Sequence, residues 1–169
     1  MRPLLLKATA LAAREFPDMN GYFVDGKYQP SNSVHVGVAI ALRAGGLVAP
    51  AIHDVDRLPL RDVMTRLGDL VKRARGGGLR SSELADSTLT VTNLGDQGTH
   101  SVFGIIYPPQ VALVGFGKPT PRPWAENGML GIRPVVTATL AADHRVSDGH
   151  AGARFLGMIE QRLREPEKL

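Results

Sequence analysis

Residues 141–150 read AADHRVSDGH and place His144 four residues before Asp148, directly after a run of strand-forming residues. An amphipathic helical pattern follows, so the decapeptide is predicted to join a strand to a helix. A neutral imidazole at such a junction can take up a proton near neutral pH, because its reference pKa is about 6.5. Asp148 lies one helical turn further on if the segment coils, where it could orient a ring or anchor the loop.

The spacing of these residues alone leaves three interpretations open. His144 and Asp148 either form a catalytic pair or belong to a polar loop that merely closes a sheet. The third interpretation is a metal site built from Asp143, His144, Asp148 and His150. Since the chain has no cysteine and no H-E-x-x-H pattern, we predict that no metal is bound.

The pattern around this junction predicts helices that alternate with strands. Helices are expected at 3–16, 59–75 and 149–163, and a hairpin around Asp25-Gly26 is expected at 22–30. Strands are expected at 33–42, 47–55, 88–93 and 110–116, and one unusually long strand at 129–144. This order predicts an α/β or α+β fold, a two-layer sandwich of a mixed sheet with helices packed on it.

Two of these strands have distinctive faces. In 33–42, bulky apolar side chains alternate with small ones such as Gly37, so the small face can accept a close backbone or a thin ligand. In 88–93, Thr88, Thr90 and Thr92 share one face. That face reflects either β-propensity on an exposed surface or a functional hydroxyl.

The composition narrows the function further. The 169 residues suffice for one domain, and the lack of cysteine excludes disulfides and thiolate catalysis within this sequence. The net charge is +4, but aromatic residues make up only 5% and the basic residues are scattered, so phosphate-bearing small ligands are favoured over nucleic acid. No apolar run is long enough to cross a bilayer, so we expect no membrane partner and a cytoplasmic location.

The stretch ADHRVSDG, residues 142–149, resembles the D-H-R-x-x-D-G signature of the dihydrolipoamide acyltransferase component of 2-oxo acid dehydrogenase complexes. The resemblance extends over nearly the whole chain, in the order of the family. It includes LKATALAAREFPDMN at 6–20, HVGVAIALRAGGLVAPAIHDVDRLPLRDV at 35–63 and STLTVTNLGDQGTHSVFGIIYPPQVALVGFGK at 87–118. Several motifs in one order are far more specific than a single histidine.

The resemblance implies a chloramphenicol acetyltransferase-like fold and coenzyme A as a substrate. His144 would be the base, Asp148 the signature aspartate, and Thr92 the hydroxyl that binds the oxyanion. Asn93, beside Thr92, and Arg145 would contact coenzyme A. The expected activity is acyl transfer between dihydrolipoamide and coenzyme A, with the lipoyl group carried on another domain or chain; the alternative is a catalytically weak, self-assembling scaffold.

The family also implies a homotrimer as the smallest unit, sometimes within a larger shell, with the site shared between subunits and with other dehydrogenase-complex components as partners. Two departures stand out. Relative to the family, 1–169 is expected to be an N-terminally truncated catalytic domain without lipoyl or subunit-binding domains, so Asp148 either lacks its basic partner or finds it in Arg145 or Arg154. The loop DQGTHS, residues 96–101, also differs from the usual M-F-G type.

Overall fold

A mixed five-stranded sheet forms the centre of the computed structural model, which describes residues 1–43 and 45–169 apart from the side chain of Asp96. Its strands, in spatial order, are β11 (Ala138–Ala142), β8 (Ala112–Phe116), β7 (Leu89–Asn93), β3 (Val36–Val38) and β6 (Ala51–Ile52). The central strand β7 runs parallel to both neighbours, whereas the β11–β8 and β3–β6 pairs are antiparallel. The predicted mixed sheet is therefore confirmed.

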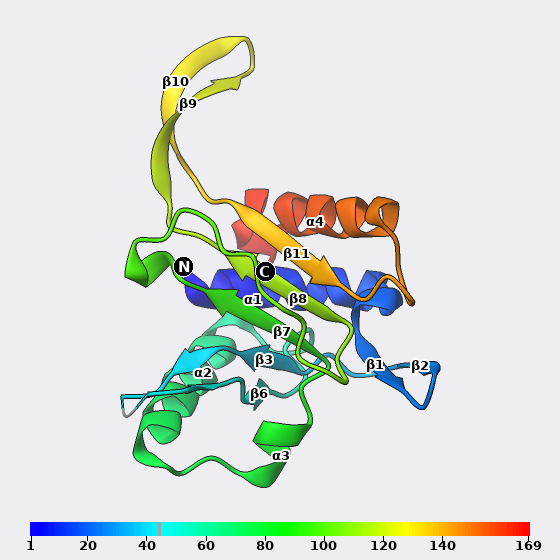
Figure 1. Cartoon of the computed structure of the whole chain (residues 1–169). Coiled ribbons are helices and arrows are strands. Elements are labelled where there is room, and N and C mark those ends of the chain that lie inside the picture. Colours follow the sequence, from blue (N-terminus) through cyan, green and yellow to red (C-terminus); the bar gives the residue numbers. More distant parts are fainter. Residues whose placement is uncertain (44) are drawn as a thin grey trace.

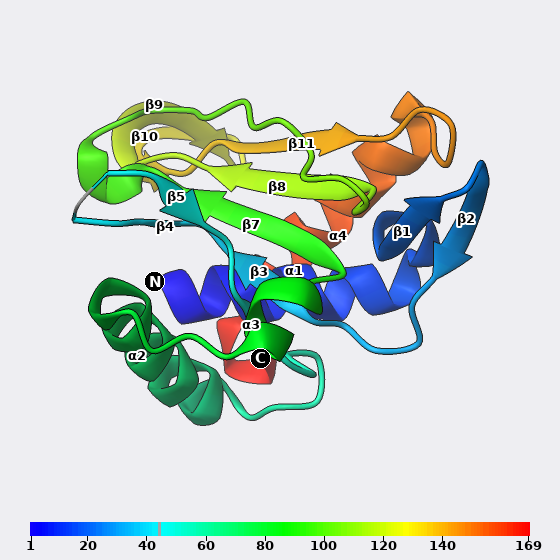
Figure 2. The same ribbon diagram turned by 60° about the horizontal axis from the view of Figure 1, so that its bottom comes forward.

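Helices pack on this sheet as the second layer (Figures 1 and 2). Helix α1 (Arg2–Glu15) contacts both α2 (Leu60–Gly76) and α4 (Gly149–Arg164), and α4 also contacts β11. The core between the layers joins apolar side chains of all three helices to those of the strands, among them Leu5, Leu67, Leu89 and Phe155. The remaining short helices are α3 (Ser81–Ala85), η1 (Pro17–Met19), η2 (Gly95–Gln97) and η3 (Pro166–Lys168).

The extended segment 98–107 covers β8 on the other face of the sheet, and glycines permit the close approach. A Cβ on Gly104 would lie 2.2 Å from the Leu113 side chain, and one on Gly117 would lie 1.9 Å from the carbonyl oxygen of His100. No side chain fits at such distances. A Cβ on Gly37 of β3 would likewise come too close to the Ser87 side chain, which confirms that the small face of this strand accepts a close neighbour.

The predicted strands at 33–42 and 47–55 are each shorter and interrupted. Residues 40–41 leave the central sheet as β4 (Ile40–Ala41) and pair with β5 (Leu47–Val48) in a separate ribbon. Pro50 explains the interruption, because it has no N–H to donate to a ladder; its carbonyl instead accepts from the backbone N–H of Val38. The prediction of two continuous strands at 33–42 and 47–55 is therefore wrong.

The prediction of a single long strand at 129–144 is also wrong. Its first half is β10 (Met129–Val135), which pairs with β9 (Thr120–Glu126) in a hairpin that extends away from the body (Figure 1), and only the second half, β11, joins the central sheet. Asn127 and Gly128 form the turn with positive φ angles of 51° and 74°. An Asn-Gly pair between apolar runs is a strong hairpin signal, and it could have been recognised in the sequence.

The other local predictions are confirmed. Strands β1 (Gly21–Val24) and β2 (Lys27–Pro30) form the hairpin around Asp25-Gly26. The three long helices begin and end within one residue of the expected limits. Among the residues that the structure describes, no helix combines the length and apolar character needed to cross a bilayer.

Candidate active site

His144 lies in a tight turn that Asp143 builds at the end of β11. The backbone N–H of Asp143 donates to the carbonyl of Val111 at 2.8 Å, and the Asp143 carbonyl accepts from the N–H groups of Val146 and Ser147. The turn leaves the His144 side chain exposed. Within the described part of the chain, its imidazole has no hydrogen-bond partner, so the ring is free to meet a substrate or a second molecule.

Arg145 is held by the same aspartate. The nearly buried carboxylate of Asp143 accepts from Arg145 Nε at 2.9 Å and from Nη2 at 2.6 Å, and these hydrogen bonds lower the pKa of Asp143. The guanidinium also lies 3.7 Å above the ring centre of Phe23. With a further contact of 3.2 Å from Nε to Oδ2, these bonds engage two of the five Arg145 N–H groups and leave others for a ligand.

Asp148 caps helix α4 and pairs with no arginine. Its Oδ1 accepts from the backbone N–H of Ala151 at 2.8 Å, and this bond lowers the pKa of the carboxyl. Neither expected partner contacts it, because Arg145 is bound to Asp143 and Arg154 lies over the ring of Phe16. A helix N-terminus offers unpaired N–H groups that attract a carboxylate, which explains why Asp148 needs no cation here.

Thr92 differs from Thr90, on the same face of β7, and from Thr88, directly before that strand. Thr88 Oγ1 donates to Asn20 Oδ1 at 2.5 Å and Thr90 Oγ1 donates to Gln110 Oε1 at 2.7 Å, and both side chains are buried. Of the two interpretations of this face, an exposed surface that reflects β-propensity alone does not apply to these two residues. Thr92 is half-buried, and no partner for its hydroxyl exists among the described residues.

The Thr92 hydroxyl is thus left for another role. Next to it, the Asn93 Oδ1 accepts from the backbone N–H of Gly95 at 2.8 Å and so fixes the corner after β7.

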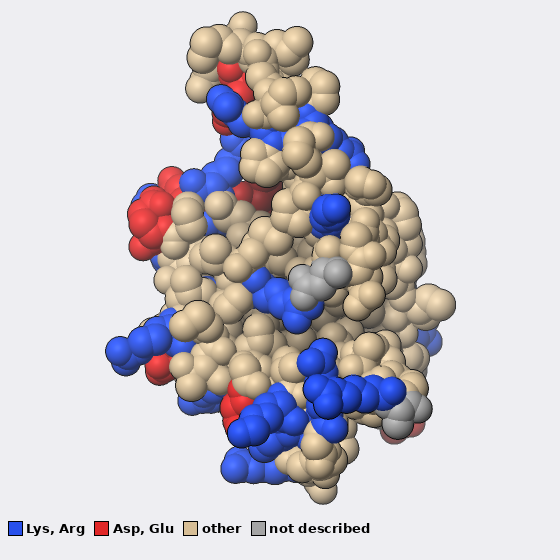
Figure 3. Space-filling model, turned by 90° about the vertical axis from the view of Figure 1, so that its left-hand side faces the viewer, with Lys and Arg blue, Asp and Glu red and all other residues tan. Residues whose placement is uncertain are grey.

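A cavity of about 110 Å³ opens beside Thr92 and Asn93. Its walls come from α1, α2, the β4–β5 ribbon, β7 and the segment that follows β7. Arg2 and Arg75 also line it. Figure 3 views this side of the molecule and shows lysine and arginine side chains gathered there, with few acidic ones between them.

The two candidate centres lie at opposite ends of the sheet. Thr92 pairs with Gly115 and Gly115 with Thr139, so His144 is five residues further along β11, which runs away from Thr92. A rise of ~3.3 Å per residue and two strand spacings of ~4.8 Å place the two residues roughly 15–20 Å apart. Figure 2 shows the arrowheads of β7 and β11 at opposite ends. The structure therefore does not bring His144 and Thr92 together within one chain.

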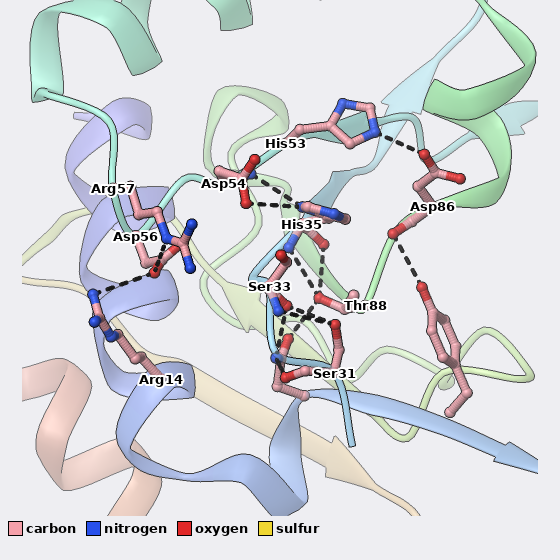
Figure 4. A network of polar contacts seen from close by, with 12 residues as sticks. Arg14, Ser31, Ser33, His35, His53, Asp54, Asp56, Arg57, Asp86 and Thr88 are labelled. Carbon is pink, nitrogen blue, oxygen red and sulfur yellow. Dashed lines mark hydrogen bonds and ion pairs between the residues drawn. The ribbon is translucent and has the colours of Figure 1, made fainter. Parts of the chain in front are cut away.

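A second polar cluster, which the sequence did not reveal, surrounds His35 (Figure 4). His35 Nδ1 accepts from the backbone N–H of Asp54 at 3.1 Å, and the His35 and His53 rings meet edge to face with centres 4.7 Å apart. His53 Nε2 lies 2.9 Å from Asp86 Oδ2. Burial, and then the neighbouring His53, lower the pKa of His35. The cluster joins the ends of β6 and α3 to the residue before β3.

No group of three or more His, Asp or Glu residues in the described part of the chain is arranged to hold a metal ion. Two of the four residues considered as ligands make other contacts. Asp143 binds Arg145 and Asp148 caps α4.

Three curated relatives of different acyl classes are similar to the chain. An acetyltransferase component of the pyruvate dehydrogenase complex from Rickettsia bellii is 33% identical over 96% of this chain. A succinyltransferase component from Rickettsia typhi is 35% identical over 97%, and a lipoamide acyltransferase of the branched-chain complex from Bacillus subtilis is 33% identical over 94%. The chain spans 37–41% of the length of these relatives.

Solved structures share the fold closely. A probable dihydrolipoamide acetyltransferase from Listeria monocytogenes has a TM-score of 0.93 at 28% identity, covering 98% of this chain and 70% of that one. The dihydrolipoamide acetyltransferase of Azotobacter vinelandii has a TM-score of 0.90 at 31% identity, with 96% and 67% covered. The cubic core of a pyruvate dehydrogenase complex has a TM-score of 0.88 at 30% identity, with 96% and 67% covered.

A chloramphenicol acetyltransferase, 17% identical with a TM-score of 0.59 and covering 96% of this chain and 77% of its own, shares the fold alone. The predicted chloramphenicol acetyltransferase-like fold is therefore confirmed. The family model of the 2-oxoacid dehydrogenases acyltransferase catalytic domain matches residues 1–169. The chain belongs to the family of catalytic domains of 2-oxoacid dehydrogenase acyltransferases.

Proposed function

We propose that the chain transfers an acyl group between dihydrolipoamide and coenzyme A, with His144 as general base and the Thr92 hydroxyl as oxyanion donor. The observation that carries the proposal is that neither side chain has a hydrogen-bond partner among the described residues, whereas the adjacent Thr90 and the nearby Asp148 are bonded within the fold. Polar groups that make no hydrogen bond within the fold are available for substrate. The family membership of the chain agrees with this activity.

The chemistry requires one base and one hydrogen-bond donor. His144 accepts the proton of the attacking thiol, whose ordinary pKa near 8.5 leaves it mostly protonated at pH 7. The sulfur then attacks the thioester carbonyl carbon, and the Thr92 O–H donates to the oxyanion of the tetrahedral intermediate. When the intermediate collapses, the departing sulfur takes the proton back from His144. Acyl passes between two substrate thiols, so no cysteine of the protein is required.

The Azotobacter vinelandii structure supports the choice of residues. The roles of a serine, a histidine and an asparagine in the catalytic mechanism of that enzyme have been investigated, and the serine stands 52 residues before the histidine and the asparagine four residues after it. Thr92 and Asp148 stand at the same spacings from His144. Threonine keeps the hydroxyl. In our proposal Asp148 positions the His144 turn by capping α4 and does not touch the reacting atoms.

A site that needs both His144 and Thr92 requires two chains. We therefore propose a homotrimer, alone or within a larger shell, in which His144 of one copy meets Thr92 of the next. Large exposed apolar side chains support such contacts: Phe103, Ile105 and Tyr107 are 83%, 88% and 63% exposed. Surfaces of this kind are usually covered by a partner.

Coenzyme A is the proposed soluble substrate. The basic side of the molecule near Thr92, where the exposed Arg75 lines the cavity, suits its phosphates. Asn93 and Arg145 are proposed contacts as well. We propose residues 1–169 as one catalytic unit, with the lipoyl group delivered on another domain or chain and with dehydrogenase-complex components as partners; the cytoplasmic location stays a prediction.

The test is transfer from acyl-CoA donors to dihydrolipoamide. His144→Ala should lower kcat/KM by ~10²–10⁴-fold, the usual effect of removing a general base. The matched control is His150→Ala, which removes an exposed imidazole from the same segment and should leave turnover unchanged. Near wild-type turnover of His144→Ala would contradict the mechanism. Assembly without transfer by the unmodified chain would instead favour the scaffold alternative.

A further inference from the structure

An aromatic ring from a distant strand supports the turn that carries His144. The guanidinium carbon of Arg145 lies 3.7 Å from the ring centre of Phe23, which belongs to β1. At this separation the two groups are in van der Waals contact, and the ring face attracts the cation. Among the residues that the structure describes, Asp143 and Phe23 supply every hydrogen bond, ion pair and ring contact of the Arg145 side chain. One neighbour therefore fixes an edge of the guanidinium, and the other covers a face of it.

The pairing of Arg145 with Asp143 fixes the backbone of the turn. Asp143 Oδ1 accepts from the backbone N–H of Arg145 at 3.0 Å as well as from its Nε at 2.9 Å. The Asp143 carbonyl accepts from the N–H groups of Val146 and Ser147, so His144 lies inside a loop that one residue closes. The carboxylate is nearly buried, and without the guanidinium it would be a buried charge without a cation. Movement of the Arg145 side chain is therefore coupled to the turn that presents the imidazole.

Phe23 is held in place by contacts that do not involve Arg145. Its backbone N–H donates to the carbonyl of Pro109 at 2.8 Å, and the Asp143 N–H donates to the carbonyl of Val111, two residues further on. The short segment before β8 thus anchors both the ring and the turn. Figures 1 and 2 show the β1–β2 hairpin and the end of β11 at the same end of the sheet. The ring is a fixed support, and the 64% exposed Arg145 is the movable side chain that rests on it.

We infer that Phe23 is a positioning residue for His144: it holds the Arg145 guanidinium against Asp143 and thereby fixes the turn that presents the base. The inference rests on the proposed function, because it concerns the rate of the reaction in which His144 takes the proton. An arginine side chain has many rotamers, so without the ring Asp143 alone must hold it. A base displaced by about 1 Å is far less effective, and conformers with a shifted turn therefore contribute little to turnover.

The first experiment is a double-mutant cycle on kcat for acyl transfer by the full chain. A ring contact with a cation at an exposed site changes an equilibrium roughly two- to fivefold, so Phe23→Leu should lower kcat by about this factor and leave KM nearly unchanged. Phe23→Tyr keeps the ring and should keep the wild-type kcat. In the Arg145→Gln background, Phe23→Leu should have no further effect, because the side chain through which Phe23 acts is gone. An equal loss of kcat in both backgrounds, or no loss in either, would overturn the inference.

The matched control for the lost charge is Arg154→Gln. Arg154 lies over the ring of Phe16, with 5.6 Å between the guanidinium carbon and the ring centre, and it belongs to α4. This substitution should change neither kcat nor the effect of Phe23→Leu. Thermal denaturation identifies any unfolded variant, and Phe23→Met is a second substitution that removes the ring should Phe23→Leu fail to fold.

The second experiment does not depend on turnover. Hydrogen–deuterium exchange, followed by mass spectrometry, reports on the three N–H groups of residues 145–147 that bond to Asp143. Their exchange should become roughly two- to fivefold faster in Phe23→Leu, whereas exchange at Ala151, in the first turn of α4, should not change. Wild-type exchange rates in Phe23→Leu would overturn the inference even if kcat falls. A wild-type chain that transfers no acyl group would contradict the proposed function, and the exchange rates would then still decide whether Phe23 supports the turn.

Discussion

Two inactive variants should restore each other if the site is shared between chains. In one chain, His144 and Thr92 are separated by roughly 15–20 Å along and across the strands, while a hydrogen bond requires about 3 Å. We expect His144→Ala and Thr92→Val, each nearly inactive alone, to regain activity when both are produced together in one cell. The first supplies an intact Thr92, and the second supplies an intact His144.

The magnitude follows from the symmetry of a closed ring, in which every site takes His144 from one chain and Thr92 from its neighbour. With equal amounts and random assembly, about one quarter of the sites contain both intact residues, so the mixture should reach about 25% of wild-type kcat. Sites within single chains would give no restoration. The two variants carry different tags, and the assay is acyl transfer by the whole mixture, because selection on both tags would raise the expected fraction of intact sites in a trimer to about one third.

A second mixture provides an independent test of whether the site is shared between chains. Wild-type chains combined with the double variant His144→Ala/Thr92→Val should retain about 25% activity if sites are shared, but about 50% if each chain holds its own site. A first mixture that stays at the level of the single variants, together with half activity in the second, would refute the shared site. Native mass measurements confirm that the tagged chains exchange.

Three further predictions concern residues near the site and in the core. Because Asp148 caps α4 through the Ala151 N–H, Asp148→Asn should change the free energy of unfolding by less than ~0.5 kcal/mol, whereas Asp148→Ala should cost about 1 kcal/mol in urea denaturation. Two 2.6 Å hydrogen bonds from Arg73 lower the pKa of the buried Glu83 to about 2, so Glu83→Gln should cost about 2–3 kcal/mol at pH 7. This difference from wild type should shrink as the pH falls from 4.5 towards 2, because a carboxyl with a depressed pKa loses its contribution there; a constant difference would contradict it. Burial lowers the pKa of His35, so the folded protein should lose stability as the pH falls below about 6.5, and His35→Asn, which keeps an acceptor but does not titrate, should reduce that loss in denaturation curves at pH 7.5 and 5.

Local signals in the sequence were sufficient for elements whose ends are set by nearby residues. Asp25-Gly26 has the φ angles of 51° and 74° that a two-residue hairpin needs, and Gly77 ends α2 with a φ of 76°. These residues act through their own backbone preferences, so no distant contact is required. The hairpin at Asn127-Gly128 carried the same signal, and the long apolar run after it concealed the change of partner strand.

The interrupted strands show where local signals fail. Alternation of bulky and small residues continues through 33–42, yet the strand changes its partner near Ala39, whose N–H donates to the carbonyl of Val91. Which neighbour accepts each N–H depends on the order of strands in the sheet, and that order is set by contacts far apart in the sequence. The role of Asp148 could not be predicted for a similar reason. Arginines that are close in the sequence do not necessarily turn their side chains towards it.

The candidate site combines both situations. Residues 141–150 contain enough local information to place His144 at the junction of a strand and a helix, since the strand, the turn and the helix cap all lie within a few positions of it. Thr92 could be identified only by resemblance, because nothing in its strand distinguishes it from Thr88 and Thr90 until the hydrogen bonds of those two are known. The opposite directions of β7 and β11 are a third piece of information, which neither segment contains by itself. Because β7 ends near the start of β11, the His144 imidazole and the Thr92 hydroxyl of one chain are too far apart to act on one carbonyl. Two copies of the same surface, related by a closed symmetry, are the simplest arrangement that unites them.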